Sequence, residues 1–143
     1  MKLFGVVLLA GVLSLIVGVG VTIALSAVAP CYSDKAGCGM SEAYRLFFVP
    51  GFVLLAMAAF GISAAGKNRE RPLWLTLITL LLVPVFLFLL AVGSDLSSGR
   101  TPNKSDFSDS LQAAAAFCAV VLVQWRLIRD FLRRREAALQ AAV

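Results

Sequence analysis

The chain has 143 residues, of which 60% are hydrophobic, and its mean hydropathy is +0.91. Soluble globular domains are roughly 45–50% apolar, so this composition excludes an ordinary soluble domain. The formal net charge is +5 and the chain contains no histidine, which excludes H-E-x-x-H metal sites and catalysis by a Ser-His pair.

Four long apolar stretches predict four transmembrane helices, because about 20 apolar residues at 1.5 Å per residue cross a hydrocarbon core of roughly 30 Å. The predicted spans are residues 3–29, 46–65, 73–92 and 111–132. They are joined by outer loops at 30–45 and 93–110 and a cytoplasmic loop at 66–72, and a basic tail follows at 133–143. We therefore predict one all-α membrane domain over residues 1–143, an up-and-down bundle of four helices.

The distribution of Lys and Arg predicts the orientation, because cytoplasmic segments carry the excess of positive charge. One side of the membrane receives Lys2, Lys67, Arg69, Arg71, Arg126, Arg129, Arg133, Arg134 and Arg135. The other side receives Lys35, Arg45, Arg100 and Lys104. Both termini are therefore expected in the cytoplasm, in a multi-pass protein of a cell membrane, with a bacterial inner membrane as our expectation. The basic residues flank spans beside anionic lipid and form no clustered surface for nucleic acid.

The first span carries small residues at helical spacing. Ala10, Ser14 and Gly18 recur every four residues and predict one smooth face for close helix packing. The sequence AVA at 27–29 has the form of a signal-peptidase site. An h-region has roughly 7–15 apolar residues, and this run is far longer, so we expect the segment to remain as a membrane anchor.

The first outer loop contains CYSDKAGC, with Cys31 and Cys38 on the predicted oxidising side, where a structural disulfide is expected. Four spans with such a pair resemble the quinone-linked thiol oxidases of the vitamin K epoxide reductase type, and this resemblance implies disulfide exchange by Cys31 and Cys38. Those enzymes use C-x-x-C and a second pair, whereas the spacing here is C-x6-C and Cys118 stands alone in the fourth span. Two thiolates do not complete a tetrahedral zinc site, so neither metal nor cofactor is predicted.

The second span begins after SEAYR, residues 41–45, where Ser41 is a candidate N-cap and Arg45 is expected at the interface, near a lipid headgroup or a partner's acid. Ala56, Ala59 and Ser63 supply further small residues for helix packing. Pro50 is expected to bend this helix.

The third span consists mostly of Leu, Phe and Val around Pro84, so we expect helices 1, 2 and 4 to pack tightly and helix 3 to be peripheral. The fourth span is interrupted by Gln124 and continues into a basic segment. Its interfacial residues, expected to meet lipid headgroups or a partner, are Trp125, Arg126, Arg129 and Arg133.

No Asp, Glu, Lys, Arg or His lies in the middle of any span, which argues against a proton-coupled carrier. The expected function is therefore non-enzymatic binding of another membrane protein, as an accessory subunit or as an immunity protein against a pore-forming toxin. The immunity role is an analogy of architecture. The alternatives are a thiol-disulfide oxidoreductase that uses Cys31 and Cys38, and a small oligomeric pore. The expected partners are membrane lipid and a membrane protein or further copies of this chain.

Overall fold

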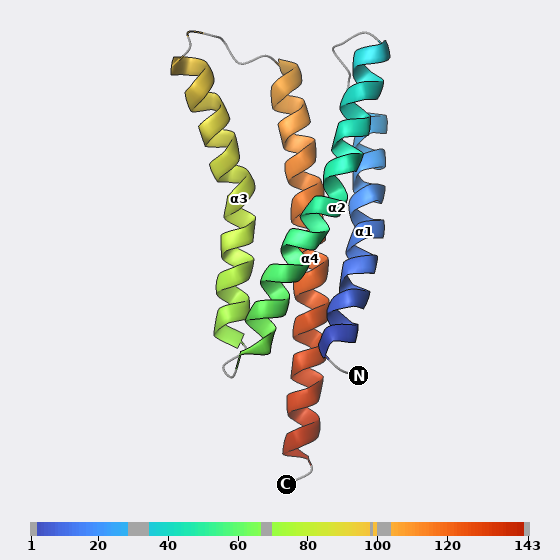
Figure 1. The fold of residues 1–143 in the computed structure, drawn as a ribbon, viewed down its shortest axis with the longest axis vertical. Helices are drawn as coiled ribbons and strands as arrows, with labels where there is room; N and C mark the ends of the chain where they lie inside the picture. Colours follow the sequence, from blue (N-terminus) through green and yellow to red (C-terminus); the bar gives the residue numbers. More distant parts are fainter. Residues whose placement is uncertain (1–2, 29–34, 67–69, 98, 100–103, 142–143) are drawn as a thin grey trace.

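The computed structural model describes residues 3–28, 35–66, 70–97, 99 and 104–141, and its secondary structure is helical (Figure 1). The four helices are α1 Leu3–Val28, α2 Lys35–Ala65, α3 Glu70–Ser97 and α4 Lys104–Gln140. All four are long and apolar enough to cross a membrane. Successive helices alternate in direction, so Leu3 and Gln140 lie at the same end of the bundle. We call this the terminal end, and the opposite end, where α1 joins α2 and α3 joins α4, the loop end.

α2, α3 and α4 are longer than the predicted spans, whereas α1 matches its span closely. α2 begins at Lys35 rather than 46, and α4 begins at Lys104 rather than 111. Residues 36–45 contain Ala, Met, Glu and Arg, which favour helix, and α2 contains no proline before Pro50. Once a helix has started, each added residue gains a backbone hydrogen bond, so polar residues next to an apolar span readily extend it. The expectation that Ser41 is an N-cap is therefore wrong: Ser41 lies inside α2, beyond its first turn.

α1, α2 and α4 form the tightly packed part of the bundle. α1 packs most extensively against α4 and then against α2. α3 contacts only α4 and α2, and no contact joins α1 with α3 in the described part of the chain. Of the most apolar 18-residue segment of each helix, 12% is buried in α3, compared with 39% in α1 and in α4. The prediction of a peripheral third helix is confirmed.

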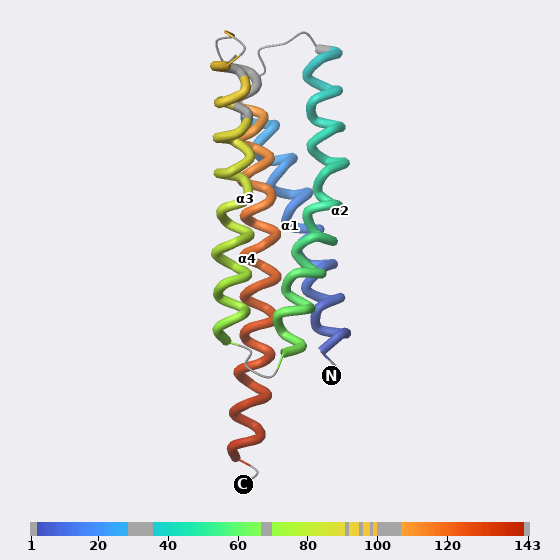
Figure 2. The backbone as a smooth tube through the Cα atoms, turned by 60° about the vertical axis from the view of Figure 1, so that its left-hand side comes forward, coloured from blue at the N-terminus to red at the C-terminus, as the bar shows by residue number. Residues whose placement is uncertain are grey.

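α2 crosses the bundle diagonally, from α1 at the loop end to α3 at the terminal end (Figures 1 and 2). Side-chain contacts mark both ends of this path: Ser26 of α1 hydrogen bonds to Glu42 of α2, and Ser63 of α2 hydrogen bonds to Thr76 of α3. α2 therefore moves away from α3 toward the loop end, and the loop-end half of α3 is left with fewer neighbours.

α4 is the longest helix, with 37 residues, which corresponds to about 55 Å at 1.5 Å per residue. It continues straight beyond the other three helices at the terminal end, as both views show. Leu132 is buried, and every side chain from Arg133 to Gln140 is exposed. The predicted continuation of helix 4 into the basic tail is confirmed.

Candidate functional site

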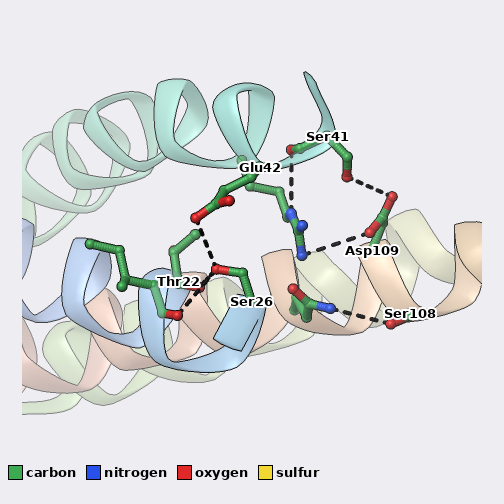
Figure 3. Close-up of polar contacts among 9 residues, drawn as sticks. Thr22, Ser26, Ser41, Glu42, Ser108 and Asp109 are labelled. Carbon is green, nitrogen blue, oxygen red and sulfur yellow. Dashed lines mark hydrogen bonds and ion pairs between the residues drawn. The ribbon is translucent and has the colours of Figure 1, made fainter. Parts of the chain in front are cut away.

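The loop end of α1, α2 and α4 holds a group of polar side chains, which we call the loop-end polar cluster (Figure 3). It comprises Thr22, Ser26, Ser41, Glu42, Arg45, Ser108, Asp109 and Gln112. Ser41 Oγ donates to Asp109 Oδ2 at 2.9 Å, and Ser26 Oγ donates to Glu42 Oε1 at 3.2 Å. The cluster therefore ties α2 to both α1 and α4.

Arg45 is the central cation of this cluster. Its side chain is 14% exposed, its Nε donates to the Ser41 carbonyl at 3.3 Å, and its Nη1 lies 3.7 Å from Asp109 Oδ1. The Arg45 side chain turns into the bundle and pairs with Asp109 of α4. Its place at a membrane interface stays a prediction. The buried Nη1 makes no hydrogen bond, and neither does the buried Gln112 Oε1. Burial costs Arg45 much of its hydration, whereas the Asp109 side chain stays 45% exposed, so the pair mainly fixes the relative positions of α2 and α4.

A second polar group lies at the centre of the bundle. Gln124 of α4 is completely buried, and its Nε2 donates to Ser14 Oγ of α1 at 2.9 Å and to the Val53 carbonyl of α2 at 3.2 Å. Ser14 Oγ donates in turn to the Gly11 carbonyl at 2.9 Å. Gln124 Oε1 makes no hydrogen bond. A single amide thus links the three tightly packed helices.

The small residues expected at helix contacts are buried or half-buried. Ala10, Ser14 and Gly18 are buried in α1, and Ala56 is buried in α2. Ala59 and Ser63 are half-buried, and Ser63 faces Thr76 of α3. A Cβ built on Gly18 would lie 2.8 Å from Val120 Cγ2 and 2.9 Å from Val49 Cγ1, so α1, α2 and α4 approach closely at this position.

The terminal end joins α3 to α4 through aromatic and charged side chains. The rings of Trp74 and Trp125 meet edge to face with centroids 5.0 Å apart. The Arg129 guanidinium carbon lies 4.8 Å from the Trp125 centroid and 5.6 Å from the Trp74 centroid, within cation–π range. Arg133 Nε lies 3.5 Å from Glu70 Oε1, and Arg126 is exposed. Arg129 and Arg133 therefore contact α3, an arrangement that their spacing along the helix did not indicate.

The cysteines lie in different parts of the molecule. Cys31 is outside the described residues, and Cys38 is half-buried in the first turns of α2, so the disulfide between them stays a prediction. Cys118 is a free thiol on α4. In the described ranges, no group of three metal-ligating side chains comes together.

A groove of about 580 Å³ lies between α3, α4 and α2 in the loop-end half of the bundle. Fifteen residues line it, of which Ser110 and Cys118 alone carry a polar side-chain atom. The walls are Leu81, Val83, Pro84, Val85, Leu87 and Phe88 of α3, Phe107, Ser110, Leu111, Ala113, Ala114, Phe117 and Cys118 of α4, and Phe52 and Leu55 of α2. Phe88 and Phe107 meet edge to face at 5.5 Å between centroids.

The groove follows from where α3 is attached. Leu73, Leu77 and Leu80 are buried, which places the terminal-end half of α3 against its neighbours. Pro84 follows one turn after Leu80 and lines the groove. Proline has no N–H, so the Leu80 carbonyl lacks its usual hydrogen bond within the helix. α3 and α4 diverge toward the loop end (Figure 1). The proline is visible in the sequence, but the groove could not be predicted from it. The groove also depends on the diagonal path of α2, which leaves the loop-end half of α3 (Figures 1 and 2).

Comparisons with protein families, with curated proteins and with solved structures find no match to this chain.

Proposed function

We propose that this protein is a non-enzymatic multi-pass membrane protein that binds a transmembrane helix of another membrane protein. It would act as an accessory subunit or as an immunity protein against a pore-forming toxin, in a cell membrane that we take to be a bacterial inner membrane. The termini are assigned to the cytoplasm, and Cys31 and Cys38 to a structural disulfide on the opposite side.

The observation that carries this proposal is the weak attachment of α3. The helix is strongly apolar, yet only 12% of its most apolar 18-residue segment is buried. One face of the helix, which we call the α3 outer face, points away from the groove wall. It consists of Leu75, Ile78, Leu82, Phe86 and Leu89, which are between 50% and 66% exposed.

The α3 outer face has the spacing of a helix-binding surface. Its residues follow one another at intervals of three and four, as in one side of a pair of packed helices. Helix association in lipid depends on van der Waals packing rather than on a hydrophobic driving force. A row of large side chains with a projecting Phe86 supplies such packing to a partner that offers small residues.

The exposed extension of α4 supplies a second point of attachment. Arg133 still pairs with Glu70 of α3, but Arg134 and Arg135 are exposed on the part of α4 that extends beyond the other three helices. An isolated helix this short is marginal in water, so a partner or an anionic lipid surface would stabilise it.

Photo-crosslinking in cells tests the proposal. A photoreactive amino acid is placed at Leu82 or Phe86 on the α3 outer face, and as controls at Ile16 or Ile23, which are exposed on α1. We expect one protein adduct of defined mass from the α3 positions and none from the α1 positions. Lipid adducts alone from both helices, or equal protein adducts from both, would contradict the proposal.

A further inference from the structure

We infer that the groove between α3, α4 and α2 is a binding site for one acyl chain of a lipid from the loop-end leaflet. This site is separate from the α3 outer face, and it does not depend on the proposed protein partner.

The chemistry of the walls selects an apolar ligand. Of the fifteen lining residues, the only polar side-chain atoms are the Ser110 hydroxyl and the Cys118 thiol. A groove of about 580 Å³ has the size of a small-molecule pocket, and it is flanked by helices long and apolar enough to span a membrane. Water is disfavoured there because it would find few hydrogen-bonding partners. Leaving the volume empty is also unfavourable, since the cost of a void grows with its size. Hydrocarbon is the component of a bilayer that fits.

The length of the groove selects an acyl chain rather than a transmembrane helix. Its wall on α4 runs from Phe107 to Cys118, eleven steps of 1.5 Å or about 17 Å. This is about half of the roughly 30 Å hydrocarbon thickness, which is the depth of one leaflet. A partner helix would cross both leaflets, but α3 is packed against its neighbours through Leu73, Leu77 and Leu80 in the other half.

The groove also has a direction. Its polar lining residue Ser110 and the Phe88–Phe107 pair lie toward the loop end, whereas Leu81 and Cys118 lie toward the middle of the bundle. The carbonyl end of the chain is therefore assigned to Phe107 and Leu111, and the methyl end to Leu81 and Cys118.

Photo-labelling with lipids of known geometry tests this assignment. The full-length protein is reconstituted in phosphatidylethanolamine–phosphatidylglycerol vesicles that contain phosphatidylethanolamine with a diazirine on one acyl chain. A diazirine near the methyl end should label Leu81 and Cys118, and a diazirine near the carbonyl end should label Phe107 and Leu111. Labelling that is independent of diazirine position, or that is no stronger than at exposed Ile16 on α1, would overturn the proposal.

Filling the groove supplies a matched comparison. Ala114→Phe introduces a ring into the groove, and Ala58→Phe introduces the same ring at an exposed position on α2. Native mass spectrometry in mild detergent should show about tenfold less retained phospholipid for Ala114→Phe and no change for Ala58→Phe. Ala114→Leu, a smaller change, keeps the test valid if the phenylalanine variant does not fold, and it should lower retention by a smaller factor. Unchanged phospholipid retention in both Ala114 variants would refute acyl-chain binding. A dimer that retains no phospholipid in the natural chain would refute it as well.

Discussion

At the scale of single residues, Gly18 marks a position where α1 approaches both α2 and α4 closely. The β-carbon of an alanine would lie 2.8 Å from Val120 Cγ2 and 2.9 Å from Val49 Cγ1. Both neighbours are β-branched and stiff, so neither side chain moves aside easily. We expect Gly18→Ala to lower the free energy of unfolding by about 1–3 kcal/mol, the usual cost of overpacking.

Gly20 in the same helix is the control for Gly18, because nothing lies within 4 Å of the β-carbon that an alanine would add there. Alanine favours helix over glycine by about 1 kcal/mol in soluble hosts, so Gly20→Ala should be neutral or stabilising. Unfolding in mixed detergent micelles measures both variants. Equal stability of the two variants would show that α1 does not approach α2 and α4 this closely.

Gln124 is the second residue whose contacts make a testable prediction. Gln124→Met keeps the shape but loses hydrogen bonds to Ser14 and Val53, each worth about 0.6 kcal/mol inside a membrane protein. It also removes the unpaired Oε1, and an unpaired buried acceptor costs about 1–3 kcal/mol. The second effect is the larger, so Gln124→Met should be at least as stable as the natural chain.

Gln124→Ala is the comparison that separates packing from hydrogen bonding. It removes the same amide but leaves a cavity beside Ser14, and should be clearly less stable than Gln124→Met in the same micelle assay. A loss of more than about 1 kcal/mol in Gln124→Met would mean that Oε1 has a partner, such as a buried water.

Some residue contacts could be predicted from the sequence and others could not. The spacing of Ala10, Ser14 and Gly18 placed small residues on one face of α1, because helical periodicity is local. The pairing of Arg45 with Asp109 joins residues far apart in the chain, and it depends on how α2 and α4 are rotated about their axes. Ser41 was misassigned as an N-cap because the helix starts upstream of the apolar run that marked the span.

At the scale of helices, the apolar runs predicted all four elements, and the absence of small residues predicted the peripheral place of α3. The helix ends could not be predicted equally well, since polar residues extend α2 and α4 beyond their apolar runs. The groove could not be predicted either, because it arises from the diagonal path of α2 past α3. That path is set by the contacts of α2 with α1, α3 and α4. The hydrophobic pattern along one helix carries no information on such contacts.

The extension of α4 beyond Leu132 should contribute little to the stability of the bundle. Every side chain from Arg133 to Gln140 is exposed, and the ion pair of Arg133 with Glu70 is between two exposed groups. Exposed pairs are worth about 0–1 kcal/mol, so a chain that ends at Leu132 should unfold within about 1 kcal/mol of the natural chain. Leu132→Ala, at a buried position, should cost about 2 kcal/mol or more in the same assay.

The same truncation separates stability from binding. If the α4 extension contacts the proposed partner, the truncated chain should fold normally but give a weaker crosslink from Phe86. A truncated chain that unfolds easily would show instead that the extension is part of the bundle.

At the scale of the whole molecule, the remaining prediction is its orientation. The two ends of the structure differ in charge, because the terminal end carries the exposed Arg126, Arg133, Arg134 and Arg135. The positive-inside rule therefore predicts that this end faces the cytoplasm. Reporter fusions after Gln140 should be active only as cytoplasmic reporters, and fusions after Ser97 only as reporters of the opposite side.

Orientation and the cysteine pair are linked, because a stable disulfide between Cys31 and Cys38 requires the loop end to face an oxidising compartment. Closing so short a ring restricts the unfolded chain by about 2–3 kcal/mol, so changing both cysteines to serine should lower stability by that amount and leave cellular function intact. A reducing agent should lower the stability of the natural chain equally and leave the double variant unchanged. Loss of function at unchanged stability, together with a trapped mixed disulfide, would instead support disulfide exchange. Cys118 is a free thiol on α4 and serves as the control. Cys118→Ser should change neither the loss of stability caused by the reducing agent nor cellular function.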